Sequence, residues 1–501
     1  MKRIRYIVVC ILCAVCFNPI QAQLNTDRIT SIGRNALYFE DYVLSIQYFN
    51  QVIKRKPYLA EPYLLRAIAK MQLADYSGAL LDCNAAIENN PFLPGAYYTR
   101  GYAYRQLDQL DQAEADFTTA LQFSPENKTY LTLRADVRAK KEHYDDALLD
   151  IDYLLSREPL SPSVNFEKGV ICLGKKDTTC ALNCFQQTVR YDSQNPANWS
   201  ALGLVQLMQD NNNDALTSLN KAINLGSKWS GDYINRGIIY YHQHNYQNAL
   251  ADLDKAVIID PINAQTYYNR GMLRAELGDY NRALEDFNTA IDLEPNQTDL
   301  RYQRAVILLQ LRQWKAALDD INELINTYPY FLPSYYLAAQ AKTALGDRKA
   351  AYQFRQQALD LEQHKDSLMS LPTEVRIAQT THPDKDRRKE FSARLAQNQT
   401  DTLFTLREIA TLDVSVTHNP ASVTALNYFQ TANDYAHQRD FTTAIEYYTK
   451  AIDADNDFAE AYFNRGLTRI YINHIDEGIA DLSKAGELGI SQAYDLIPCF
   501  R

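Results

Sequence analysis

The sequence repeats itself every 34 residues. Tyr233–Gly237 and Tyr267–Gly271 share the pattern Tyr-x-Asn-Arg-Gly and lie 34 residues apart, and Tyr462–Gly466 carries the same pattern. Extending this period along the 501-residue chain gives ten units without an insertion and then, after a gap, two more; they start at residues 26, 60, 94, 128, 162, 196, 230, 264, 298, 332, 425 and 459. A chain with this period forms a stacked array, in which each unit packs on its neighbours.

Two positions of the unit carry only small side chains. Position 8 is Gly or Ala in all twelve units, and position 20 is Ala, Gly or Ser. Small residues at two fixed positions allow the backbones of two helices to approach closely where they cross. Position 32 is Pro in seven units, and because the residue before a proline avoids the helical conformation, it ends the second helix. The unit is therefore predicted to be a pair of helices joined by a turn.

This pattern resembles the tetratricopeptide repeat family, in which an aromatic residue, Leu-Gly, Tyr, Ala, Phe, Ala and Pro follow one another. Trp199–Gly203 and the segment from Gly278 to Pro295 match it closely, and the twelve units cover 12 × 34 = 408 of the 501 residues. The resemblance implies an all-α fold: a right-handed α-solenoid of about twelve 34-residue helix-turn-helix repeats, whose first helices line a concave groove.

The repeats divide the chain into regions. We expect a signal peptide over residues 1–22, a ten-repeat array over 26–365, a polar insertion or linker over 366–424, a two-repeat module over 425–492 and a C-terminal cap over 491–501. The insertion departs from the period and is rich in charge. The ends of a repeat array need a cap that shields the last apolar face from water.

The first 22 residues have the features of a secretory signal. Three basic residues precede an apolar stretch from Ile7 to Phe17, and Ala22 is a small residue at the expected cleavage site. Such a segment is too short to span a membrane and is removed on export; an uncleaved N-terminal anchor is the alternative. We therefore expect an exported protein, in the periplasm or on the cell surface of a Gram-negative bacterium, with no transmembrane span after signal removal.

Charge and motifs limit the chemistry. The formal net charge is −10, which argues against nucleic acid and anionic membranes as main partners. No phosphate-binding glycine loop, metalloprotease motif or nucleophile elbow occurs, so the sequence predicts no enzyme, no cofactor and no metal site. His242 and His244 lack further nearby ligands and are interpreted as turn residues. His382–Lys385 is similar to the loop signature of J-domain co-chaperones, but the supporting helices have no clear counterpart.

Five cysteines remain once the first 22 residues are removed. This number is odd and too small for a disulfide framework. Cys172, Cys180 and Cys184 occupy positions 11, 19 and 23 of one unit. In an antiparallel helix pair, positions 11 and 19 lie near each other, so Cys172 and Cys180 can reach bonding distance. The alternative is that these cysteines are buried as small apolar residues.

The family resemblance implies that positions 2, 5, 6, 9, 12 and 13 of the first helices face the groove. Position 5 is aromatic in most units, and Asn occupies position 6 in three of them. Aromatic rings and amides suit an extended peptide. The candidate partner-binding residues are Tyr98, Tyr102, Asn235, Tyr241, Tyr268, Asn269, Tyr302 and Tyr336. The alternative is that the position 5 aromatics pack against the following repeat.

These features predict a scaffold or adaptor that binds a protein or peptide partner in the cell envelope through the concave groove. A structural envelope-assembly subunit that binds through its convex face or its ends is one alternative. A co-chaperone or enzyme centred on residues 366–424 is another.

Overall fold

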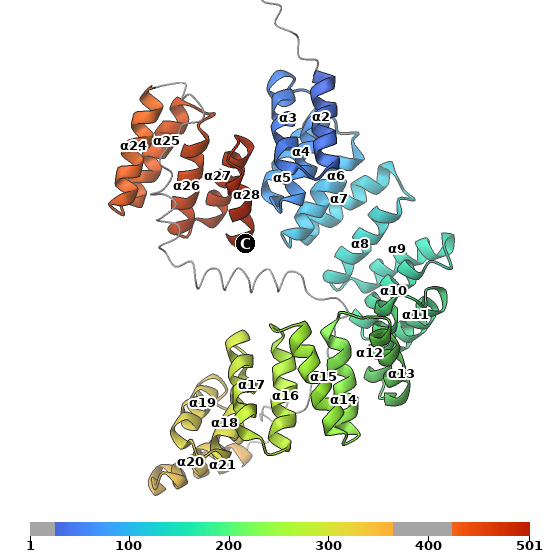
Figure 1. Cartoon of the computed structure of the whole chain (residues 1–501), viewed down its shortest axis with the longest axis vertical. Coiled ribbons are helices and arrows are strands. Elements are labelled where there is room, and N and C mark those ends of the chain that lie inside the picture. Colours follow the sequence, from blue (N-terminus) through green and yellow to red (C-terminus); the bar gives the residue numbers. More distant parts are fainter. Residues whose placement is uncertain (1–25, 364–422, 501) are drawn as a thin grey trace, which may run out of the picture. The chain divides into compact units, whose positions relative to one another are not determined.

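The computed structural model describes residues 26–363 and 423–500, and within these ranges every regular element is a helix (Figure 1). The first array contains α2 (Thr26–Tyr38), α3 (Tyr42–Arg55), α4 (Ala60–Gln72), α5 (Tyr76–Asn89), α6 (Pro94–Gln106), α7 (Leu110–Phe123), α8 (Lys128–Lys140), α9 (Tyr144–Arg157), α10 (Pro162–Gly174), α11 (Thr178–Tyr191), α12 (Pro196–Met208), α13 (Asn212–Asn224), α14 (Ser230–His242), α15 (Tyr246–Ile259), α16 (Ala264–Glu276), α17 (Tyr280–Leu293), α18 (Thr298–Gln310), α19 (Trp314–Thr327), α20 (Leu332–Ala344) and α21 (Arg348–Gln363). The C-terminal part contains α24 (Val423–His437), α25 (Phe441–Ala454), α26 (Ala459–Tyr471), α27 (Ile475–Glu487), α28 (Gln492–Leu496) and the 3-10 helix η2 (Ile497–Phe500).

These helices confirm the repeat register. Each even-numbered helix from α2 to α20 starts at the first residue of a 34-residue unit, as does α26, while α24 starts two residues early at Val423. Each is followed by the second helix of its unit. The all-α repeat solenoid expected from the sequence is therefore confirmed.

One turn geometry joins the two helices of every described repeat. The N–H of position 16 donates to the C=O of position 11, as Asp279 does to Arg274, which satisfies a carbonyl that the helix end leaves unpaired. Position 15 has positive φ throughout, although only Gly278 and Gly346 are glycines there. Where position 16 is Asp or Asn, its side chain caps the second helix, as Asp279 does by accepting from the N–H of Arg282 at 3.4 Å; Gln109, Gln313 and His474 make no such bond.

Close helix crossings explain the small residues at position 8. A Cβ on Gly169 would lie 2.6 Å from Phe185, and one on Gly203 would lie 2.8 Å from Leu219. Both partners stand at position 24, where a large apolar side chain fills the space beside the crossing. These position 24 side chains are buried, so the core of each repeat lies between its own two helices.

An arginine at position 7 connects neighbouring repeats. Arg236 donates to both carboxylate oxygens of Asp252 in its own second helix, at 2.8 and 2.6 Å, and to Asn220 of the preceding repeat at 2.8 Å. The same arrangement recurs at Arg66, Arg100, Arg134, Arg270, Arg304 and Arg465, in each case with an Asp sixteen residues later and a polar side chain sixteen residues earlier. Each arginine therefore holds three helices together through charge-assisted hydrogen bonds.

The chain forms two compact units. One contains Met1–Asp150 together with Lys389–Arg501, and the other contains Ile151–Arg388. Within the first unit, α27 packs against α3 and α5. After α27, the chain ends in α28 and η2, where Tyr494 and Ile497 are buried.

Candidate partner-binding surface

The structure separates the predicted binding residues into two groups. Asn235, Tyr268 and Asn269 are buried, with exposed fractions of 0%, 0% and 1%, so they offer no surface to a partner in this structure. This corrects the expectation that they line the groove. The accessible members of the set are Tyr98, Tyr102, Tyr241, Tyr302 and Tyr336, of which only Tyr336 is classed as exposed.

The burial has a packing cause. The ring of Tyr268 lies 6.2 Å from that of Phe287 within its own repeat. Tyr302 packs edge-on against Phe331, the last residue of its own repeat, with ring centroids 5.3 Å apart. Tyr98 stacks on Tyr130 of the following repeat at 5.2 Å. Position 5 aromatics are therefore packing residues first, with only part of each ring left for a partner.

A hollow of about 620 Å³ lies over the first helices of repeats 1 and 2. Asp27, Thr30, Ser31 and Arg34, at positions 2, 5, 6 and 9 of repeat 1, form one side. Its other lining residues are Tyr58, Leu59, Ala60, Glu61, Pro62, Asn89 and Asn90. The volume is in the range of ligand sites in proteins, and five of the lining residues, Asp27, Thr30, Ser31, Arg34 and Glu61, stand at positions that the family resemblance assigns to the groove.

The hollow is polar and carries charged side chains. Arg34 forms an ion pair with Glu61 of the next repeat, and both side chains are about half exposed. Asp27 adds a second carboxylate. Tyr98 and Tyr102 occupy positions 5 and 9 of repeat 3, the same register as Thr30 and Arg34, and therefore continue this first-helix surface within the same unit of the chain.

A polar cluster surrounds Tyr241, another of the predicted residues. Tyr246 donates to Glu276 of the next repeat at 2.7 Å, and its hydroxyl lies 3.0 Å from Nδ1 of His244. The ring of Tyr241 lies 5.9 Å from that of Tyr246. Hydrogen bonds from the two tyrosines lower the pKa of Glu276 below its usual range. His244 is thus a turn residue, in agreement with the sequence interpretation.

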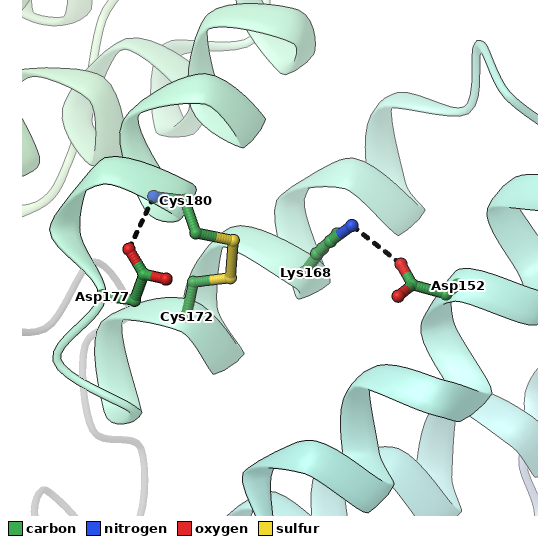
Figure 2. Close-up of a disulfide and its surroundings, with 5 residues drawn as sticks. All are labelled: Asp152, Lys168, Cys172, Asp177 and Cys180. Atoms are coloured by element: carbon green, nitrogen blue, oxygen red, sulfur yellow. Dashed lines mark hydrogen bonds and ion pairs between the residues drawn. A yellow bond between two sulfur atoms is a disulfide. The ribbon is translucent and has the colours of Figure 1, made fainter.

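A disulfide links Cys172 in α10 to Cys180 in α11, with a Cα–Cα distance of 5.9 Å (Figure 2). The Sγ of Cys184 lies within 4.8 Å of both sulfur atoms, and these three cysteines are the one such group of possible metal ligands in the described part of the chain. Two of the three sulfurs are used by the disulfide. Figure 2 also shows Lys168, which takes the arginine position of this repeat and pairs with Asp152 of the preceding repeat at 2.7 Å.

One buried carboxyl stands out in repeat 7. Asp232 is fully buried in α14 and accepts a hydrogen bond from Ser200 of the preceding repeat at 2.7 Å. Burial raises its pKa to about 6, although hydrogen bonds from Ser227 and Ser200 act in the opposite direction.

Two predicted features lie outside the described residues. One is the signal peptide over residues 1–22, and the other is the insertion over 366–424, which includes His382–Lys385; only residues 423 and 424 of this insertion are described, at the start of α24. Across the described ranges, no helix combines the length and the apolar character needed to cross a membrane.

Sequence reasoning missed the hollow and the position 7 arginines. The arginine had a visible signal, because it is the Arg of the repeated Tyr-x-Asn-Arg-Gly pattern. Its partners stand sixteen residues away in each direction and share no local motif with it. The hollow carried a weaker signal, since its groove positions hold Asp, Thr, Ser and Arg instead of aromatic residues.

Comparison with known families agrees with the repeat geometry. Tetratricopeptide repeat models match residues 94–127, 239–301 and 429–469, and the first of these ranges coincides with the unit that starts at residue 94. The chain is a tetratricopeptide repeat protein. No curated protein matches its sequence.

Solved structures resemble this tetratricopeptide repeat protein at low identity. A tetratricopeptide repeat protein from Parabacteroides merdae is 16% identical, covers 47% of this chain and 93% of its own, and gives a TM-score of 0.41. The C-terminal part of a repeat protein from Cytophaga hutchinsonii is 18% identical, covers 47% of this chain and 97% of its own, and gives a TM-score of 0.40. Yeast Tom70 is 15% identical, covers 94% of this chain and 94% of its own, and gives a TM-score of 0.32.

Proposed function

We propose that this tetratricopeptide repeat protein is a non-catalytic scaffold that holds an extended segment of a protein partner in the cell envelope. The observation that carries the proposal is the hollow over repeats 1 and 2, because it lies on the first-helix positions that this family uses for partners. Tyr98 and Tyr102 extend this surface into repeat 3. Partly exposed tyrosines provide contact area at a low entropic cost.

Export is the second element of the proposal. The basic and apolar N-terminal segment favours it, and so does the disulfide between Cys172 and Cys180, since structural disulfides persist in oxidising compartments. We place the protein in the periplasm or on the surface of a Gram-negative cell. N-terminal sequencing of protein from the native host tests this element: retention of Met1 in a cytoplasmic fraction would contradict it.

The groove is tested with matched tyrosine variants. Partners are captured from native membranes with the full-length protein and identified by mass spectrometry, and the affinity of the main partner is then measured. Replacing Tyr98 and Tyr102 together by Ala should weaken binding by about 2 to 4 kcal/mol, or roughly 30-fold or more. The control is Tyr352→Ala, because Tyr352 is 64% exposed on a second helix, α21.

Stability decides between contact and packing. Tyr98 stacks on Tyr130, so the double variant is also melted. If it unfolds early but keeps its affinity per folded molecule, the tyrosines are packing residues and the groove assignment is wrong.

A second candidate is a structural subunit of an envelope assembly that binds through its outer helices. The contact of α27 with the second helices α3 and α5 favours it, because it shows that second helices of this array can accept another helix. Equal binding loss in the Tyr352→Ala control would support this candidate over the groove.

A further inference from the structure

The C-terminal repeats contact the first two repeats through an apolar surface. Ile46 of α3 and Ala69 of α4 belong to the same buried cluster as Leu482 and Ala485 of α27 and Ile497 of η2. Partly buried side chains from the same side of repeats 1 and 2 pack on it: Leu37, Tyr42, Val43 and Leu73. The surface is therefore built from α3, the ends of the first helices α2 and α4, and the turn that follows α4.

A buried group of charges lies at this surface. The side chain of Lys70 is 1% exposed, and its ammonium forms ion pairs with Asp82, at 3.0 Å, and with Glu487 of α27. Arg66 lies 4.0 Å from Glu487 and also pairs with Asp82. Lys484 of α27 also pairs with Glu487, at 2.9 Å, so three cations share the carboxylates of Asp82 and Glu487. Burial alone lowers the pKa of Lys70, but Asp82 and Glu487 outweigh this and raise it.

Two further hydrogen bonds complete the contact. The carbonyl of Glu487 accepts from the amide of Asn50 at 2.6 Å, and Ser483 donates to the carboxylate of Asp75. Asp75 also caps α5 by accepting from the N–H of Gly78. Lys54 and Asp457 form a further ion pair, but both side chains are largely exposed. A buried charge pair with its hydrogen bonds contributes far more to the choice of partner than an exposed one.

Comparison with the other repeats shows what is special about repeat 2. Position 11 is also basic in Arg138, Arg274, Arg469 and Lys342. The three arginines pair with the Asp at position 23 of their own repeats and with a second carboxylate, and they remain 13–20% exposed, while Lys342 is 30% exposed. Lys70 makes the equivalent bond to Asp82, but it is buried completely and its second carboxylate, that of Glu487, comes from α27.

Position 19 gives an independent indication. Repeat 2 has Gly78 there, whereas every other repeat carries a side chain. A Cβ on Gly78 would collide with the Ser483 hydroxyl of α27 and with the Asp75 carboxylate. In repeat 8, Asp279 caps its helix beside a side chain at position 19, that of Arg282, so the cap alone does not require glycine. The approach of α27 does.

We propose that repeats 1 and 2 are a recognition site for the protein's own C-terminal two-repeat module, which holds this module without help from the covalent connection. Lys70 and Glu487 determine the pairing, and Gly78 provides the space for α27. The module covers the outer surface of α3 and α5, so a partner that binds there must first displace it. This inference is independent of the groove proposed above.

The test separates the two parts of the full-length chain after folding. A site-specific protease sequence is inserted within residues 366–422, the chain is cut, and the two pieces are passed through a size-exclusion column at micromolar concentration. We expect the pieces to elute together. Glu487→Lys should separate them, because it replaces the carboxylate that Lys70 and Arg66 face by a further cation, and the charge exchange Lys70→Glu with Glu487→Lys should restore co-elution.

Two further variants make the test specific. Gly78→Gln introduces the residue that repeat 3 carries at the same position, Gln112, and should separate the pieces although repeat 2 still folds by circular dichroism. Lys54→Glu changes the exposed pair of the same surface and should leave them together. Separation of the unmodified pieces, failure of the charge exchange to restore binding, or equal loss with Lys54→Glu would overturn the proposal.

Light scattering of the uncut chain identifies the occupant. A monomer that stays monomeric in Glu487→Lys is expected. A dimer that dissociates in this variant would mean that the site binds the module of a second copy, which would overturn the assignment to the chain's own module.

Discussion

Two glycines at the same repeat position should respond in opposite ways to the same substitution. A Cβ on Gly237 would make ordinary contacts, 3.4 Å from the Ala249 carbonyl and 3.5 Å from Leu253. A Cβ on Gly466 would lie 2.9 Å from the Gly478 carbonyl and 3.2 Å from Leu482. Both glycines lie inside first helices, where Ala is favoured over Gly by about 1 kcal/mol.

Gly237→Ala should therefore stabilise its repeat by up to about 1 kcal/mol. Gly466→Ala gains the same helix propensity but forces α26 and α27 apart against a backbone oxygen, and overpacking of this kind costs about 1 to 3 kcal/mol. The Gly466 variant should thus be less stable than the Gly237 variant by about 1 to 3 kcal/mol.

Hydrogen exchange is the suitable assay, because a repeat array opens locally and a single melting curve averages over its repeats. Protection of the amides in α14 and α15 is compared with that in α26 and α27 for each variant and the unmodified protein. Equal destabilisation by the two substitutions would refute the argument from backbone approach. An increase in protection around Gly466 would also refute it.

Two other predictions concern buried charge. Arg236→Met should destabilise repeats 6 and 7 by about 1.5 to 3 kcal/mol, because Asp252 stays largely buried without its main partner. Lys168→Met should cost about 1 kcal/mol or less, since its partner Asp152 is 54% exposed. Urea denaturation of both variants measures the two free energies of unfolding. The pKa of Asp232 is raised to about 6 on folding, above the unfolded value of about 3.9, so the folded state binds the proton more tightly and its contribution to stability falls as pH rises from about 4 to 6. Asp232→Asn should remove this loss of stability, which is on the order of 2 to 3 kcal/mol. If the free energy of unfolding of the variant and of the unmodified protein depended on pH in the same way, the prediction would be wrong.

The sequence alone was sufficient for the secondary structure. The 34-residue period located the start of each first helix in the array, because contacts within a repeat and between neighbours involve residues fewer than about 34 positions apart and recur in every unit. The small residues at positions 8 and 20 reported the helix crossing for the same reason. In eight of the twelve repeats the turn was also encoded locally, in the Asp or Asn at position 16.

The accessible surface was decided by tertiary packing. Tyr268 and Tyr336 occupy the same repeat position, yet one is buried and the other is 42% exposed, because the side chains around each position 5 differ between repeats. Periodicity assigns both to one wall and cannot distinguish them. The candidate site therefore moved from Asn235, Tyr268 and Asn269 to the hollow over repeats 1 and 2 and the partly exposed Tyr98 and Tyr102.

The contact of Lys70 with Glu487 is the clearest case of information that only the tertiary structure holds. The two residues are 417 positions apart, and each looks ordinary in its own repeat, one as a basic position 11 and the other as the last residue of a helix. A repeat pattern reports the interactions that every unit shares. An interaction made once, between the two ends of the array, has no period, and only the folded chain brings its charges together.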